Sequence, residues 1–417
     1  MNHQINVRKF VFKLSLLVLM VTITNCSGTR SPIATSQTSL VTPTLSVTKT
    51  ETPTPAATVR PSRLTTDCLD VSDESLNQGQ FNGTLVLSEI DGPISLLNLE
   101  TGEKVSLPDA YPANVVVSPD RSKLAYDEVH GDVIVSDKYG NNLENIPDHQ
   151  QRLLPAQWLD NARLVISESR TEKGKPRVLD SLIVMNLSTG EKQEILPDYP
   201  DINYFFPPAF QWEGYYLSRI VPDPTLHYLV YPAFGAKLVL WDVLHAREVR
   251  HVYVVDELGT PWWSPDGTRF ITSAPMKFPD TDNTYFNIDD GLPYKGGNDL
   301  ITVNQVGETQ RLTYLTTEYK AKEFHYTWSP DGQQVAFWMQ LDNSDDSQLA
   351  VVDVSTGKIR NYCISTTDGG TSTVWSPDGS QLAISPSNSE TSTVIVDLEH
   401  HTAIKVADKA VVLGWMR

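Results

Sequence analysis

An all-β fold is predicted for this chain, built as a closed ring of seven four-stranded units. Three observations predict it: a composition that favours strands and turns, a short Trp-Ser-Pro-Asp-Gly phrase that recurs, and a second recurring phrase ending in Thr-Gly. The chain has 417 residues, of which 40% are hydrophobic and 20% are charged, so most of it can form a core. A closed ring of repeats can use this length as one domain.

The first phrase has the chemistry of a tight turn. It occurs as Trp-Ser-Pro-Asp-Gly at residues 263–267, 328–332 and 375–379, with weaker copies near residues 117, 158 and 220. Ser, Pro and Gly at the first, second and fourth corners suit a type I turn. Alternating apolar residues follow each copy, so each phrase is predicted to join an inner strand A to a strand B. The Trp residues that end strand A are expected to pack between neighbouring units, whereas Trp262, beside Trp263, should point to the opposite face.

The second phrase marks the turn between strand C and strand D of each unit. Clear copies are Asn-Leu-Glu-Thr-Gly at 98–102, Asn-Leu-Ser-Thr-Gly at 186–190 and Asp-Val-Ser-Thr-Gly at 353–357, and looser copies start at residues 136, 242, 304 and 397. Seven copies at this spacing predict a seven-bladed β-propeller of four-stranded blades.

The ends of the chain predict how the ring closes. The first unit begins at residue 81 with a strand B and has no strand A before it. The chain ends at residues 411–417 with a strand A that no turn follows, and Trp415 stands where Trp263 stands in its unit. The C-terminal strand is therefore expected to complete the first blade, which leaves the ring without an open seam.

The N-terminal residues predict that the protein is exported from the cytoplasm. Residues 1–25 carry a basic start and an apolar run of the length of a secretory signal peptide, shorter than a membrane-spanning helix. The run ends at Cys26, which resembles the lipidated cysteine of a bacterial lipobox, although Asn25 departs from the small residue usual before it. We expect lipid anchoring through Cys26 to the outer face of a bacterial membrane. Plain secretion, with cleavage nearby, is the alternative.

Residues 26–66 are rich in Thr, Ser and Pro and have little to bury, so they are predicted to form a disordered tether. A short segment, residues 67–80, then precedes the propeller at residues 81–417. The formal net charge of −18 opposes a nucleic-acid partner. The three cysteines, at positions 26, 68 and 363, exclude a disulfide-rich scaffold and any Cys-x-x-Cys site. With Cys26 lipidated, we expect Cys68 and Cys363 to form a disulfide in an oxidising compartment, and two free thiols are the alternative.

The Trp-Ser-Pro-Asp-Gly phrases resemble the WD40-like repeats of the TolB-type β-propeller family, over about residues 81–417. The resemblance implies the propeller fold but not the role of TolB, because only residues 67–80 stand where TolB has a further domain. The same repeat occurs beside the catalytic domain of prolyl-oligopeptidase-type peptidases, for which this chain has no room and no Gly-x-Ser-x-Gly motif. It also occurs in oligogalacturonate lyases, which bind a metal in the central channel through histidines.

The connections between strands B and C vary in length and are expected to carry function on one face of the ring. The longest, about residues 274–298, offers clustered oxygen donors that suit Ca²⁺. Two interpretations stay open, a ligand-binding or Ca²⁺-binding loop and a solvated insertion. The candidate residues are Asp280, Asp282, Asn283, Tyr285, Asp289 and Asp290.

A basic loop in the third unit is a candidate for steering an anionic partner, or is a solvated hairpin tip. Its residues are Arg170, Lys173, Lys175 and Arg177. Among nine histidines, His149 and His325 are placed by the repeat near the channel mouth, where they are candidate metal ligands. Packed or surface histidines are the alternative.

The sequence therefore leaves two candidate functions open. The first is a non-catalytic, monomeric module that binds a protein, peptide or carbohydrate through its B–C loop face, with no cofactor. The second is an enzyme, a lyase or hydrolase, with a metal or carboxylate site at the channel mouth. The fold alone does not decide between them, because propellers host many functions.

Overall fold

The structure is a computed structural model, and the description covers the following parts of the chain. These are residues 63–73, 81–90, 92–107, 110, 114–128, 131–147, 152–170, 178–195, 220–233, 237–254, 261–276, 288, 290–367, 373–386 and 391–417. The propeller lies within one compact unit, residues 56–417.

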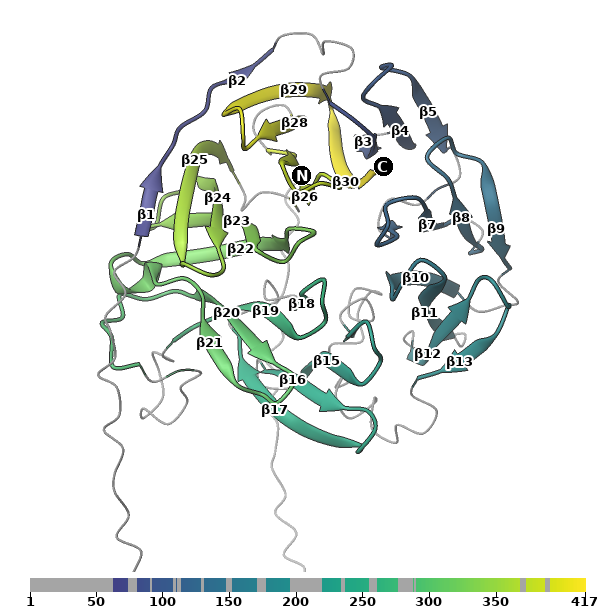
Figure 1. The fold of residues 1–417 in the computed structure, drawn as a ribbon, viewed down its shortest axis with the longest axis horizontal. Coiled ribbons are helices and arrows are strands. Elements are labelled where there is room, and N and C mark those ends of the chain that lie inside the picture. Colours follow the sequence, from purple (N-terminus) through teal and green to yellow (C-terminus); the bar gives the residue numbers. More distant parts are fainter. Residues whose placement is uncertain are drawn as a thin grey trace, which may run out of the picture. The chain divides into compact units, whose positions relative to one another are not determined.

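Seven antiparallel sheets are arranged as blades around a centre (Figure 1). Each blade is given from its inner strand to its outer strand. Blade 1 consists of β30 (Ala410–Met416), β3 (Thr84–Glu89), β4 (Ile94–Asn98) and β5 (Lys104–Leu107). Blade 2 consists of β6 (Val116–Val117), β7 (Leu124–Asp127), β8 (Val133–Ser136) and β9 (Asn142–Ile146). Blade 3 consists of β10 (Arg152–Trp158), β11 (Arg163–Arg170), β12 (Val178–Asn186) and β13 (Lys192–Glu194).

The remaining four blades follow in chain order. Blade 4 consists of β14 (Val221–Pro222), β15 (Tyr228–Ala233), β16 (Lys237–Asp242) and β17 (Arg247–Tyr253). Blade 5 consists of β18 (Trp262–Trp263), β19 (Arg269–Ala274), β20 (Asp299–Asn304) and β21 (Thr309–Arg311). Blade 6 consists of β22 (Ala321–Trp328), β23 (Gln334–Leu341), β24 (Ser347–Asp353) and β25 (Lys358–Thr366). Blade 7 consists of β26 (Val374–Trp375), β27 (Gln381–Ile384), β28 (Ser392–Asp397) and β29 (Thr402–Asp408), and a short 3-10 helix η3 (Leu315–Thr317) precedes blade 6.

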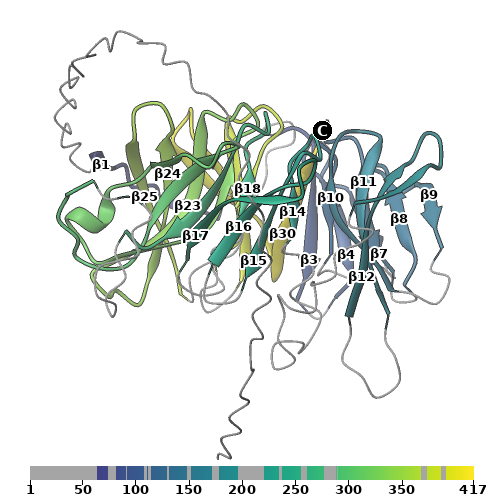
Figure 2. The same ribbon diagram turned by 90° about the horizontal axis from the view of Figure 1, so that it is seen from below.

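The predicted fold class and the predicted closure are both confirmed. Strand β30, from the C-terminus, pairs with β3, from the first unit, in a register that sets Thr84 opposite Met416 and Leu85 opposite Trp415. The ring is thus closed by main-chain hydrogen bonds between the two ends of the repeat array. Figure 2 shows the ring from the side, with the blade strands running between its two faces.

The A–B turns form because the phrase satisfies its own polar groups. In blade 5 the Gly267 amide donates to the Ser264 carbonyl at 2.8 Å, and Gly267 has a φ of +68°. The Ser264 hydroxyl and the Thr268 amide both donate to the Asp266 carboxylate. Burial alone would raise the pKa of Asp266, but these hydrogen bonds hold it below its ordinary value. The turns of blades 6 and 7 repeat the Ser-to-Asp hydrogen bond.

The repeated Trp residues link neighbouring blades. The indole N–H of Trp263 donates to the Val221 carbonyl at 3.0 Å, and that of Trp328 donates to the Trp262 carbonyl at 3.1 Å. The same contact joins blade 3 to blade 2 and blade 7 to blade 6. Trp263 is buried and Trp262 is half exposed, as the strand alternation predicts.

The weak copy in the fourth unit lies two residues later than the sequence suggested. The Asp223 amide donates to the Tyr228 carbonyl, as Ser264 does to Arg269, so Asp223 and not Val221 occupies the Ser position. Pro224 is therefore the turn proline. It lies against Gly267 of blade 5, just as Pro265 lies against Gly332 of blade 6.

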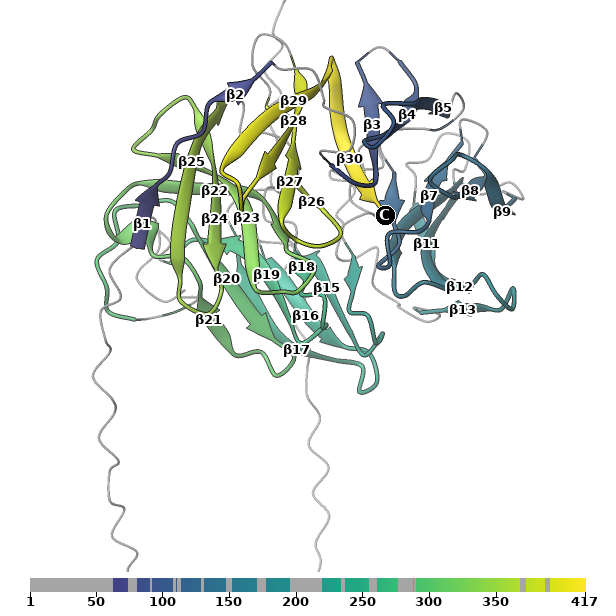
Figure 3. The ribbon, with the colours of Figure 1, turned by 45° about the horizontal axis from the view of Figure 1, so that its top comes forward.

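An unpredicted feature is a strap, residues 63–73, that runs outside blades 6 and 7 (Figures 1 and 3). Its strand β1 (Arg63–Thr66) pairs in parallel with β25, and its strand β2 (Val71–Ser72) pairs in parallel with β29. The composition of residues 26–66 predicts a disordered tether, whereas residues 63–66 form a strand paired with blade 6. Their backbone gains hydrogen bonds from an unoccupied sheet edge, and edge pairing needs no particular side chains.

Candidate functional site

The loop face is best defined where blades 5 and 6 meet. The longest B–C connection returns there toward β20, and its last residues, 290–298, are held by specific bonds. The Lys295 amide donates to the Thr316 carbonyl at 2.7 Å, the Asn298 amide donates to the Ala321 carbonyl at 2.8 Å, and the Tyr294 hydroxyl donates to the Gly297 carbonyl at 2.6 Å. Gly297 approaches the backbone of Ala321 so closely that a Cβ atom would collide with it. The base of the loop is therefore fixed to the two blades.

A buried ionic cluster lies beneath this base. Arg311, at the end of β21, donates to Asp299 at 2.6 Å and to Asp290 at 2.7 Å. Its guanidinium also lies over the Tyr314 ring, 4.6 Å from the ring centroid. Asp299, the first residue of β20, is 0% exposed and also accepts a hydrogen bond from the Thr316 amide at 3.2 Å. Buried charges persist when they are paired and hydrogen-bonded in this way.

Glu323, on the inner strand β22, adds a second buried carboxyl to the cluster. It is 0% exposed, and its Oε1 atom has no hydrogen-bond partner within the described part of the chain. Burial, together with the nearby charge of Asp299, raises the pKa of Glu323 well above its usual range. The Thr313 hydroxyl lies 3.0 Å from Glu323 Oε2 and 3.2 Å from Asp299 Oδ1, and one hydroxyl proton serves only one of them. A neutral Glu323 that donates to Thr313, which in turn donates to Asp299, satisfies both contacts.

The structure places few of the predicted loop ligands. Asp290 lies in the ionic cluster, where Arg311 binds its carboxylate. The others, Asp280, Asp282, Asn283, Tyr285 and Asp289, lie outside the described residues. Arg170 ends strand β11, with its backbone paired to Val178, while Lys173, Lys175 and Arg177 also lie outside the described residues.

The two candidate histidines are likewise only half described. His149 lies outside the described residues. His325 sits at an irregularity in strand β22, with a φ of +47°, and burial lowers its pKa. In the described part of the chain, no group of three or more His, Cys, Asp or Glu residues is placed to hold a metal ion.

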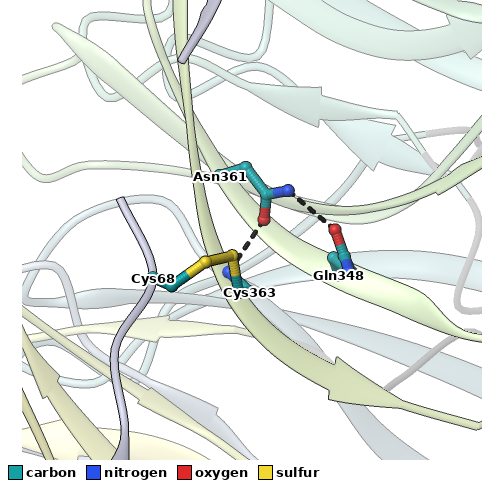
Figure 4. Close-up of a disulfide and its surroundings, with 4 residues drawn as sticks. All are labelled: Cys68, Gln348, Asn361 and Cys363. Atoms are coloured by element: carbon teal, nitrogen blue, oxygen red, sulfur yellow. Dashed lines mark hydrogen bonds between the residues drawn. A yellow bond between two sulfur atoms is a disulfide. The ribbon is translucent and has the colours of Figure 1, made fainter. Parts of the chain in front are cut away.

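Cys68 and Cys363 are joined by a disulfide with a Cα–Cα distance of 4.8 Å (Figure 4). Cys363 has a φ of +58°, where β25 departs from regular pairing with β24. Its amide donates to the Asn361 side-chain oxygen at 2.8 Å, and the Asn361 amide group donates to Gln348 at 2.7 Å. These bonds hold Cys363 in its unusual conformation, so that its side chain reaches the strap.

The sequence did not reveal the ionic cluster or the strap. Asp299, Arg311 and Glu323 belong to no repeated phrase, and the single available signal was a charged residue at an inward position of the alternating run 321–328.

The part of the chain that the structure describes contains no helix with the length and apolar character of a membrane span.

Comparison with known proteins found similarities among solved structures alone. No protein-family model matches this sequence, and no curated protein matches it. Among solved structures, the chain is similar to Kuenenia stuttgartiensis hydrazine synthase, with a TM-score of 0.40 and 15% identity, covering 72% of this chain and 80% of that one.

Two further solved structures show the same level of similarity. The Myceliophteria thermophila Cps50 (Swd1) β-propeller domain has a TM-score of 0.43 and 11% identity, covering 74% of this chain and 95% of that one. An oligogalacturonate lyase in complex with manganese has a TM-score of 0.35 and 17% identity, covering 82% of this chain and 78% of that one. At these values the similarities carry no argument about activity or ligand, and the seven-bladed propeller rests on the strand pairing of this chain.

Proposed function

We propose that this protein is an extracytoplasmic β-propeller, tethered to a membrane through Cys26, that binds a protein, peptide or carbohydrate through its B–C loop face. The three Trp-Ser-Pro-Asp-Gly turns support a relation to the TolB-type family, in keeping with that role. The tether and its anchor rest on the sequence of residues 1–62.

One observation carries the choice of the loop face. The C-terminal end of the longest B–C connection is fixed by the ion pair of Asp290 with Arg311, which also pairs with Asp299 of β20. Backbone bonds from Lys295 to Thr316 of η3 and from Asn298 to Ala321 of β22 hold it further. Because residues 290–298 are already held in place, a ligand that contacts them does not have to order them, which lowers the entropic cost of binding. The C–D turns of the opposite face are short and satisfy their own polar groups, as Asp353 does with Ser355 and Thr356.

The test compares the two faces in the full-length protein. One variant replaces residues 277–289 with a short Gly-Ser connection, which leaves Asp290 and Arg311 in place. The control variant replaces the exposed turn residues 188–190 of blade 3, on the opposite face. Each is presented to peptide and glycan arrays and to envelope extract, and both must melt as the wild type does.

We expect a discrete ligand that the wild type and the control retain and the loop variant loses. Binding that survives in the loop variant, or that fails equally in both variants, would contradict the loop face as the binding surface.

A further inference from the structure

A half-open groove lies between blades 6 and 7, on the face opposite the B–C loops. Its volume is about 480 Å³, within the range of small-molecule sites. It is bounded by the C–D turn and the outer strand β25 of blade 6, and by the A–B and C–D turns of blade 7. The loop-face proposal does not involve these residues.

The C–D turn of blade 7 differs from those of blades 2 and 5. In blades 2 and 5 the glycine of the C–D turn packs against the outer strand of the preceding blade, as Gly140 does on Val105 and Gly307 does on Arg250. Blade 7 has His401 at this position, with a φ of +55°. The His401 side chain turns outward to Asp67 of the strap, at 3.1 Å. His401 is thus not among the residues that line the groove.

The wall formed by β25 is cationic. Lys358, Arg360 and Tyr362 alternate along the strand, so their side chains point to the same side, toward blade 7. Tyr362 is buried at the inner end of this wall, and burial raises the pKa of its hydroxyl. Among the described residues, no carboxylate lies within the 4 Å of an ion pair from Lys358 or Arg360. Two cations with free bonding capacity thus face one groove, in a protein whose net charge is −18.

The other lining groups select the kind of anion. Thr356 and Ser380 bring hydroxyl groups to the rim, and Leu398 contributes apolar surface. The Asp353 carboxylate already accepts hydrogen bonds from Ser355 and Thr356 at 2.7 and 2.8 Å. Glu399, exposed on the blade 7 side, opposes a second negative charge on the ligand.

We propose that this groove binds a small, hydroxyl-bearing anion with a single negative charge. Lys358 and Arg360 hold the anionic group, Arg360 through the planar donors that suit carboxylate and phosphate oxygens. Thr356 and Ser380 bond the ligand hydroxyls, and Leu398 contacts its carbon chain. The strap backs this wall, because Arg63 and Thr65 pair with Lys358 and Arg360 along the outer edge of β25.

The test is isothermal titration of the full-length protein with matched small molecules. Gluconate and sorbitol differ in one carboxylate, and glycerol 3-phosphate presents a phosphate instead. We expect gluconate to bind at least tenfold more tightly than sorbitol. Glycerol 3-phosphate carries nearly two negative charges at pH 7, so it should bind more weakly than gluconate, and tighter binding of glycerol 3-phosphate would overturn the assignment to a singly charged ligand.

Three variants decide whether the groove is the site. Lys358→Gln and Arg360→Gln should each weaken gluconate binding at least tenfold, while Lys192→Gln, on the exposed outer strand of blade 3, should leave it unchanged. Melting curves establish that each variant is folded. Equal affinity for sorbitol and gluconate, or a Lys358→Gln/Arg360→Gln double variant that binds as the wild type does, would overturn the proposal. Neither result bears on the loop face, which these substitutions do not touch.

Discussion

The disulfide between Cys68 and Cys363 is expected to stabilise the whole propeller, not only the strap. The perturbation is the double substitution Cys68→Ser/Cys363→Ser, which removes the bond without leaving a free thiol. The strap keeps its other contacts, since the Asp67 amide donates to the Asn361 carbonyl at 2.7 Å and the Leu69 amide donates to the Tyr362 carbonyl at 3.0 Å.

The magnitude follows from the length of the loop that the bond closes. The two cysteines are separated by 295 residues, so the unfolded chain loses much of its conformational freedom when they are joined. The chain-entropy relation gives roughly 5.7 kcal/mol for such a loop at 25 °C, and native disulfides commonly contribute about 2–5 kcal/mol. We expect the double variant to lose between about 2 and 6 kcal/mol of unfolding free energy.

The assay is urea unfolding of both proteins, read by tryptophan fluorescence. Wild type with reductant should match the double variant, and labelling of unreduced, denatured wild type should find neither Cys68 nor Cys363 free. Limited trypsin cleavage after Arg63 reports separately whether the strap leaves its edge. An unfolding free energy within about 1 kcal/mol of the wild type would refute the loop-entropy argument.

Three further predictions concern the closure of the ring by β30, the buried carboxyl of Glu323 and the lipid anchor at Cys26. Trp415→Ala should cost about 3–5 kcal/mol of unfolding free energy, because Trp415 is 0% exposed. The control Trp262→Ala should cost less than about 1 kcal/mol, because Trp262 is 48% exposed. Equal losses of unfolding free energy in urea would contradict the closure of the ring by β30. The pKa of Glu323 is raised in the folded protein, so the folded state keeps the carboxyl proton at a pH where the unfolded chain has released it. The contribution of Glu323 to the unfolding free energy therefore falls as the pH rises above about 4.3, the ordinary pKa of a glutamate. The Glu323→Gln variant should lack that part of the decline, and superimposable pH profiles of unfolding free energy would show that the group titrates normally. Mass spectrometry of the membrane-extracted protein should find an acylated Cys26 as the first residue, and an unmodified N-terminus elsewhere would exclude the anchor.

Local chemistry explains why so much of the ring could be predicted. The A–B turns need Ser, Pro, Asp and Gly in fixed order, because Gly267 must adopt a positive φ and Asp266 must accept the bonds of its own turn. Such requirements act within a few residues, so they can be recognised in the sequence. The seven copies of the C–D phrase were enough to predict seven blades. The missing first inner strand and the spare final one were enough to predict that β30 pairs with β3.

The candidate sites were less accessible, because their residues meet only across blade boundaries. Asp299, Arg311 and Glu323 lie in three different strands, and nothing in the local sequence shows that their charges are buried together. The groove is lined by residues of blades 6 and 7 that are far apart in the chain, so it forms only when the two blades pack together.

By itself, then, the sequence determined the propeller, the number of blades and the closure, since turns and strand alternation are encoded by neighbouring residues. The tertiary structure decided where the strap lies and which charges the blades bury. Strand β1 pairs through its backbone with the free edge of β25, and such edge pairing is almost independent of side chains. Position in the ring, and not local sequence, therefore determined where the strap, the ionic cluster and the groove form.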